Sequence, residues 1–155
     1  MPISVDDLSE FAVKVSESPG SNETALRASS SRAYYAAFHA LLPMVMRLPR
    51  STKHRAGSNH ITHEDFVTRL SELSRGVVSD PDLVALQARA GQLCRTVDAC
   101  RASRVKADYK LTTEFHAGEA AAQVRRALLV LRAVREATAP PGGACGTVPA
   151  SQSSR

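Results

Sequence analysis

The stretch of sequence that decides the fold is SRAYYAAFHALL, residues 31–42. Apolar side chains in and just after it recur at helical spacing and form one seam of a helix. The members of this seam are Tyr34, Phe38, Leu41 and Val45. Arg32, Tyr35 and His39 stand at i, i+3 and i+7, so they line up on an adjacent face. Such a row can hold an anion or move a proton, and it equally fits a hydrogen-bonded contact between helices.

The first half of the chain predicts three helices. Residues 5–17 form the first, with Ser4 as its cap. Its buried stripe is expected to contain Leu8, Phe11, Ala12 and Val15. The second helix begins near Asn22 and runs through the quoted stretch to Pro43, which lacks an N–H and is expected to kink or end it. A third helix follows Thr62, which begins a motif similar to a capping box.

The second half predicts two longer helices. The fourth has Pro81 in its first turn, and its apolar positions alternate steps of three and four residues. These positions are Leu83, Leu86, Ala90, Leu93, Val97 and Cys100. The fifth is capped by Thr112 or Thr113. Its seam is expected to contain Ala117, Ala121, Val124, Leu128, Leu131 and Val134. We therefore expect an all-α antiparallel bundle of four or five helices in residues 1–137, and a disordered tail in residues 138–155.

The next position in the rhythm of the fourth helix is Arg104, where an apolar residue is due. A buried guanidinium without a partner is very costly, so Arg104 must meet a carboxylate, a ligand phosphate or water in a cleft. Asp108 is one candidate partner, four residues further on. The alternative is an arginine that lays its stem on apolar surface and directs its charge outward.

Charge and length narrow the class of protein. The 155 residues fit one domain, and the net charge of +5 permits an acidic partner such as RNA, DNA or nucleotide phosphates. Residues 47–60 hold four basic side chains and no acidic one. This segment is interpreted either as a solvated loop or as a loop that contacts phosphate through Lys53 and His54.

No metal site, no disulfide bond and no membrane-spanning segment are expected. His60 and His63 have metal-ligand spacing, but no nearby cysteine or clustered carboxylate completes a ligand set, so we expect no metal and no cofactor. The three cysteines form no CxxC pair and are expected to be free thiols in a reducing compartment. With no signal peptide and no apolar run of about 20 residues, a cytoplasmic protein without a membrane segment is expected.

Two motifs resemble those of the HEPN-domain family. Residues 31–40, SRAYYAAFHA, resemble its RAYYAxFHA signature, and residues 104–109, RVKADY, are similar to the RxxADY signature of one HEPN subfamily. Lys53 and His54 resemble the KH segment that lies between the two signatures in that subfamily. The resemblance covers roughly residues 5–136, with the two motifs in the family's order.

The resemblance implies a helical bundle that dimerises through its motif-bearing face. Many HEPN proteins are metal-independent ribonucleases of toxin–antitoxin, abortive-infection or other antiviral systems. Their active motif is an arginine followed after four to six residues by a histidine, with two copies meeting across the dimer. The arginine holds the phosphate while an RNA 2′-hydroxyl attacks the phosphorus, and the histidine moves the proton.

This chain departs from that motif at Tyr109, which stands where the histidine would be. The ordinary pKa of a tyrosine is about 10, so it is a poor base at neutral pH, although it can donate a hydrogen bond to phosphate. The resemblance therefore implies phosphate or RNA binding at Arg104 and Tyr109 more than cleavage. Our hypothesis is that His39 supplies the missing imidazole.

Three functions follow as expectations. The first is a homodimer that binds and possibly cleaves RNA, with Arg104, Tyr109 and His39 as its reacting groups. Phosphate contacts are then expected from Arg32, Tyr35, Arg101, Lys53 and His54. The second is a non-catalytic HEPN module that partners a nucleotidyltransferase-type antitoxin or a larger defence complex. The third is a bundle that binds a nucleotide rather than RNA.

Overall fold

The computed structural model describes residues 3–49 and 61–139. Its helices are α1 Val5–Glu17, α2 Glu23–Val45, α3 His63–Leu73, α4 Pro81–Gln87, α5 Ala90–Tyr109 and α6 Ala117–Thr138. No strand occurs in these two ranges, so the predicted all-α class is confirmed. Lys53 and His54 lie outside the described residues, and so does the expected tail from residue 140 onward.

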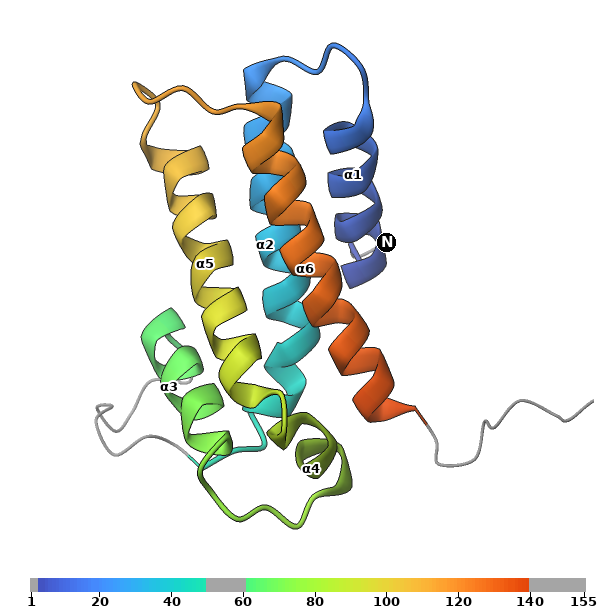
Figure 1. Ribbon diagram of the computed structural model, residues 1–155, viewed down its shortest axis with the longest axis vertical. Helices are drawn as coiled ribbons and strands as arrows, with labels where there is room; N and C mark the ends of the chain where they lie inside the picture. Colours follow the sequence, from blue (N-terminus) through green and yellow to red (C-terminus); the bar gives the residue numbers. More distant parts are fainter. Residues whose placement is uncertain (1–2, 50–60, 140–155) are drawn as a thin grey trace, which may run out of the picture.

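The four long helices α1, α2, α5 and α6 lie side by side, and α3 and α4 pack at one end of this bundle (Figure 1). Helix α2 is the centre of the arrangement because it packs against α1, α5 and α6. None of the helices in the described ranges is both long and apolar enough to cross a membrane.

Small side chains let the neighbouring helices approach α2 closely. Its fully buried residues include Ser29, Ser30, Ala33, Ala36 and Ala37. The Ser29 hydroxyl donates to the Ala12 carbonyl of α1 at 2.8 Å, and the Ser30 hydroxyl lies 3.3 Å from that of Ser103 in α5. Close approach of backbones therefore fills the space around this part of α2, while larger buried side chains such as Phe66 and Leu70 fill the interior elsewhere.

Pro43 does not end α2, which continues to Val45. The proline removes the one hydrogen bond that its N–H would give to the carbonyl four residues earlier, and it does so in the last turn of the helix. The backbone N–H of Met46 still bonds to the Leu42 carbonyl at 2.9 Å. Burial of Leu41, Met44 and Val45 holds this last turn against the bundle.

The predicted fourth helix is in fact two helices, α4 and α5. The chain turns at Arg89, whose backbone N–H bonds to the Leu86 carbonyl three residues earlier, and Arg89 is the N-cap of α5 without a side-chain cap. Leu86 and Ala90 are both fully buried on either side of this turn. The apolar rhythm runs through the break, which is why the spacing predicted one helix.

Helix α6 is capped by His116, so the expected cap at Thr112 or Thr113 was wrong. The Glu119 carboxylate accepts from the His116 backbone N–H at 3.0 Å. Phe115, immediately before the cap, is buried in a small apolar cluster with Leu26, Ala107 and Ala120. Burial of this ring holds residues 111–115 in a connecting segment and delays the start of the helix.

Three residues expected in the interior are exposed. One is Ala117, the first residue of α6. The other two are Phe11, which keeps 45% of its surface, and Leu128, which keeps 42%. Each of these two directly precedes or follows a buried alanine, Ala12 or Ala127, and successive helical residues point about 100° apart. Both therefore lie at the margin of their helix's buried stripe.

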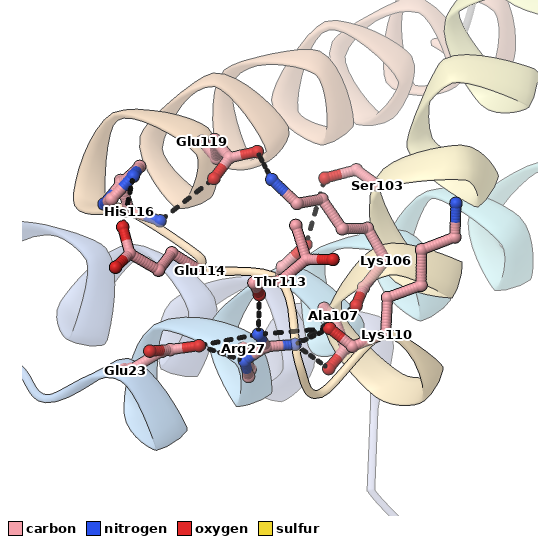
Figure 2. Close-up of polar contacts among 11 residues, drawn as sticks. Glu23, Arg27, Ser103, Lys106, Ala107, Lys110, Thr113, Glu114, His116 and Glu119 are labelled. Atoms are coloured by element: carbon pink, nitrogen blue, oxygen red, sulfur yellow. Dashed lines mark hydrogen bonds and ion pairs between the residues drawn. The ribbon is translucent and has the colours of Figure 1, made fainter.

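Arg27 of α2 holds the C-terminal end of α5 (Figure 2). Its Nη1 donates to the carbonyls of Lys106 at 3.1 Å and Ala107 at 2.9 Å. Its Nη2 donates to the Thr113 carbonyl, and its Nε donates to the Glu23 carboxylate at 2.7 Å. The last carbonyls of a helix have no partner inside the helix, and this guanidinium supplies one. The end of α5 that carries the RVKADY motif is thereby fixed to α2.

Replacing Arg27 with alanine is expected to lower the free energy of unfolding by about 2 kcal/mol or more, because the Ala107 and Thr113 carbonyls lose the donor that Arg27 gives them. Urea unfolding followed by circular dichroism measures this change. Arg75→Ala, at an exposed position after α3, is the matched control and is expected to change little. Equal stability of the two variants would contradict the anchoring role.

Candidate functional site

The Arg104 side chain of α5 is held against α2. Its Nη2 donates to the Tyr35 hydroxyl at 2.8 Å. Its Nε lies 2.7 Å from Oδ2 of Asp108, an ion pair without hydrogen-bond geometry. Ser31 of α2 donates to the same carboxylate oxygen at 3.2 Å. The guanidinium that interrupts the apolar rhythm therefore meets a carboxylate and a hydroxyl, and 21% of its side chain stays exposed.

The Arg104 guanidinium also lies over two aromatic rings. Its central carbon is 5.5 Å from the Tyr35 ring centre and 5.0 Å from that of Tyr109. Partial burial lowers the pKa of Arg104, but Tyr35 and Asp108 more than offset this and raise it above its ordinary value. The group is therefore a fixed positive charge at every pH at which the protein is folded.

Arg32, Tyr35 and His39 share one groove, as their spacing on α2 predicts. The other wall comes from the start of α1, with Ile3, Ser4, Val5 and Leu8. The rings of Tyr35 and His39 are stacked with their centres 6.2 Å apart, and the Arg32 and His39 side chains are exposed. Tyr35 is half-buried and links this groove to Arg104. We call these three residues the α2 row.

Two predicted site residues lie elsewhere. Tyr109 is 67% exposed at the end of α5 and contacts the site through Arg104. Arg101 does not line the groove of the α2 row. Its Nε lies 3.5 Å from Oδ1 of Asp98, and it lines a second groove between α3 and α5.

Sequence reasoning missed His63 as part of a polar cluster. Its Nδ1 lies 3.0 Å from the Tyr34 hydroxyl, and its Nε2 lies 3.8 Å from Oδ1 of Asp98. His63 lines the same groove as Arg101. The sequence had suggested His63 only as one half of a weak metal pair, because Tyr34 belongs by spacing to the apolar seam. The Tyr34 ring lies in that seam, while the Tyr34 hydroxyl contacts His63.

The protonation states of this cluster follow from burial. Burial raises the pKa of Tyr34 to about 12, so the hydroxyl keeps its proton. Burial, followed by the positive charge of Arg101, lowers the pKa of His63, and Asp98 opposes these effects only in part. His63 is therefore neutral at physiological pH, and its hydrogen bond with Tyr34 is one between neutral groups.

The electrostatic character of the α2 row differs from that of Arg104. Asp108 balances the charge of Arg104, whereas Arg32 makes no ion pair within residues 3–49 and 61–139. The positive charge available to a ligand in this groove is therefore that of Arg32, with a hydroxyl and an imidazole beside it. Within the same ranges, no group of three or more metal-ligating side chains is positioned to hold a metal ion.

Comparison with protein-family models, with curated proteins and with solved structures found no match.

The unfolding free energy is expected to fall between about pH 7.5 and about pH 5.5 because of His63. Its lowered pKa means that the unfolded chain takes up the proton at a higher pH than the folded chain. The stabilisation that neutral His63 contributes is complete above the ordinary histidine pKa. It is lost as the pH falls toward the lowered pKa that His63 has in the folded protein. Urea unfolding of wild type and His63→Asn at both pH values measures this loss. The variant is expected to lose less unfolding free energy than wild type between the two pH values.

His116→Asn is the control for this pH dependence, because His116 is exposed at the N-terminus of α6. Four carboxyl groups have a lowered pKa and lose stabilisation only at more acidic pH, outside this window. They are Asp7, Asp80, Glu119 and Glu136. An identical loss of stability in wild type and His63→Asn would contradict the assignment to His63.

Proposed function

We propose that this protein is a HEPN-type RNA-binding protein that acts as a homodimer in a toxin–antitoxin or antiviral-defence system. The observation that supports this proposal best is the α2 row, in which a tyrosine, a histidine and an arginine without an ion pair in residues 3–49 and 61–139 line one groove. The two sequence motifs that resemble the family meet at this point, since Tyr35 of the first hydrogen-bonds to Arg104 of the second.

The groove has the groups that a single RNA strand needs. Arg32 offers a guanidinium to a backbone phosphate, and its exposed position lets the phosphate approach. The exposed ring of His39, stacked on Tyr35, offers a flat surface to a base. Arg104 contributes by fixing the Tyr35 hydroxyl, because its own charge is balanced by Asp108.

Cleavage in this groove would use His39 as the group that moves the proton. The 2′-hydroxyl oxygen forms a bond to the adjacent phosphorus, and its proton passes to the imidazole. The bond from phosphorus to the 5′-oxygen breaks, which leaves a 2′,3′-cyclic phosphate and a 5′-hydroxyl end that takes up a proton. An exposed imidazole, which can accept a proton at one step and donate it at the next, suits both transfers.

A non-catalytic HEPN module is the second candidate, and one contact favours it. Arg104 is paired with Asp108, and Tyr109 stands where the family places its histidine, so this motif has neither a free arginine nor an imidazole. In that function the same face binds a partner such as a nucleotidyltransferase-type antitoxin or a defence complex. A groove that takes a single nucleotide is the third candidate, and a rise in melting temperature with nucleotides but not with RNA would support it.

Replacing Arg32 with alanine is expected to weaken RNA binding and to reduce by about one the slope of log affinity against log salt, because one phosphate contact is lost. Fluorescence anisotropy with a labelled single-stranded RNA over a salt series measures both. Arg75→Ala, at an exposed position that does not line the groove, is the control for overall charge. Salt-independent binding by the wild type would contradict the RNA-binding proposal.

Replacing His39 with alanine is expected to slow RNA cleavage by about a hundredfold or more while leaving binding nearly intact. The assay incubates labelled RNA with protein in the presence of a metal chelator and detects the cyclic phosphate end. Arg104→Lys, which keeps the charge but not the planar group, tests whether Tyr35 must be fixed in place. Salt-dependent binding without cleavage by the wild type would favour the non-catalytic module, and undiminished cleavage by His39→Ala would exclude His39 as the proton-transfer group.

A further inference from the structure

The C-terminal end of α5 and the residues after it expose three consecutive side chains. They are Tyr109, Lys110 and Leu111, of which the tyrosine keeps 67% of its surface and the leucine 72%. In proteins that bind single-stranded nucleic acids, an aromatic ring stacks on a base and a cationic side chain beside it contacts the backbone phosphate. Tyr109 and Lys110 bring both kinds of group to adjacent positions of the chain.

The Tyr109 ring is oriented by Arg104 of the same helix. The central carbon of the Arg104 guanidinium is 5.0 Å from the centre of the ring. Arg104 is in turn held by the Tyr35 hydroxyl and the Asp108 carboxylate. Because the ring lies against a fixed group and still exposes most of its surface, it loses less freedom on stacking than an unsupported side chain would lose.

The Lys110 ammonium group is a positive charge that other side chains leave available. It makes no ion pair in the described part of the chain, and Figure 2 shows it turned away from the contacts of Arg27. Asp108, two residues earlier, is paired with Arg104 instead. A phosphate that approaches Lys110 therefore does not have to displace a carboxylate from it.

The main chain at this end of α5 repels a phosphate less than a bare helix C-terminus would. The last carbonyls of a helix carry a partial negative charge. The Arg27 guanidinium offsets this charge here, because it donates to the carbonyls of Lys106, Ala107 and Lys110. The contact that fixes α5 to α2 therefore also prepares the end of α5 for an anion.

A series of flat groups connects Tyr109 with the α2 row. The rings of His39 and Tyr35 are stacked with their centres 6.2 Å apart. The central carbon of Arg104 lies 5.5 Å from the centre of the Tyr35 ring and 5.0 Å from that of Tyr109. The exposed members of this series are His39 at one end and Tyr109 at the other. A strand bound beside His39 therefore reaches Tyr109 over side chains that already contact one another.

We propose, on the basis of the RNA-binding function above, that Tyr109 and Lys110 form a second nucleotide subsite. The Tyr109 ring stacks on a base, and the Lys110 ammonium group binds the adjoining phosphate. The RNA strand continues from the α2 row over Tyr35 and Arg104 to this subsite. Tyr109 thus positions the RNA through its ring, and its hydroxyl takes no part in proton transfer.

Two labelled decanucleotides test the stacking, one an RNA of ten adenosines and the other an abasic strand with the same phosphates. In fluorescence anisotropy, Tyr109→Ala is expected to bind the adenosine strand about tenfold more weakly than wild type or worse, because a base loses its ring partner. Tyr109→Phe keeps the ring and is expected to bind it as wild type does. Tyr109→Ala is expected to bind the abasic strand unchanged, because that strand has no base to stack.

Replacing Lys110 with alanine tests the phosphate contact. Lys110→Ala is expected to weaken binding of both strands and to reduce by about one the slope of log affinity against log salt. Arg75→Ala, which removes an equal charge at an exposed position after α3, is the control and is expected to keep the wild-type slope. Circular dichroism of each variant shows that it is folded.

The subsite and the RNA-binding function fail by different results. If Tyr109→Ala binds the adenosine strand as wild type does while Arg32→Ala binds it more weakly, the subsite is overturned and the RNA-binding function stands. The subsite is also overturned if Tyr109→Ala weakens both strands equally, or if Tyr109→Phe binds as weakly as Tyr109→Ala. If wild type binds neither strand, the RNA-binding function fails, and the subsite fails with it.

Discussion

The contact between α2 and α5 depends on two guanidinium groups that cross it in opposite directions. Arg27 reaches from α2 to the last carbonyls of α5, and Arg104 reaches from α5 to the Tyr35 hydroxyl of α2. Each charge has a carboxylate partner on its own helix, Glu23 for Arg27 and Asp108 for Arg104. A seam made of apolar residues alone would fix the distance between the helices but not their register along each other. The two arginines fix that register, so Tyr35 and Asp108 are held at one level.

The middle of α2 makes this arrangement possible because its buried residues from Ser29 to Ala37 are small, apart from Tyr34. Alanines and serines bring α1, α5 and α6 close to its backbone, and a close approach is what lets a side chain such as Arg27 reach main-chain carbonyls on the next helix. This packing leaves polar side chains in the interior. Gln123 of α6 is fully buried and donates to the Cys100 carbonyl at 3.0 Å, while its Oε1 has no hydrogen-bond partner within the described residues.

Local spacing predicted the features of this protein that lie within one helix. The ion pair of Arg104 with Asp108 and the shared groove of the α2 row both follow from positions three, four or seven residues apart. The break at Arg89 escaped prediction because the turn there keeps the apolar rhythm in phase. The cap at His116 escaped it because the burial of Phe115 is a tertiary contact, and the strongest local cap candidates were the preceding threonines.

The cluster of Tyr34, His63 and Asp98 could not be predicted for a different reason. Its members come from three helices, and Tyr34 was assigned by its spacing to the apolar seam. A tyrosine satisfies both descriptions at once, because its ring packs in the core while its hydroxyl reaches a polar neighbour. Neighbouring tyrosines on α2 therefore serve two separate clusters, one through each hydroxyl.

The two arginines Arg104 and Arg32 differ in whether their charge is available to a ligand, and this difference bears most directly on function. Arg104 is oriented by Tyr35 and Asp108, so a ligand phosphate would have to compete with a carboxylate that is already in place. Arg32 has no such competitor in the described residues and stands in the same groove as His39. An anion approaching this face would therefore bind first at Arg32, and its affinity would be set by the exposed arginine of the α2 row rather than by the arginine of the RVKADY motif. Arg104 would act on such an anion only indirectly, because its hydrogen bond orients the Tyr35 hydroxyl.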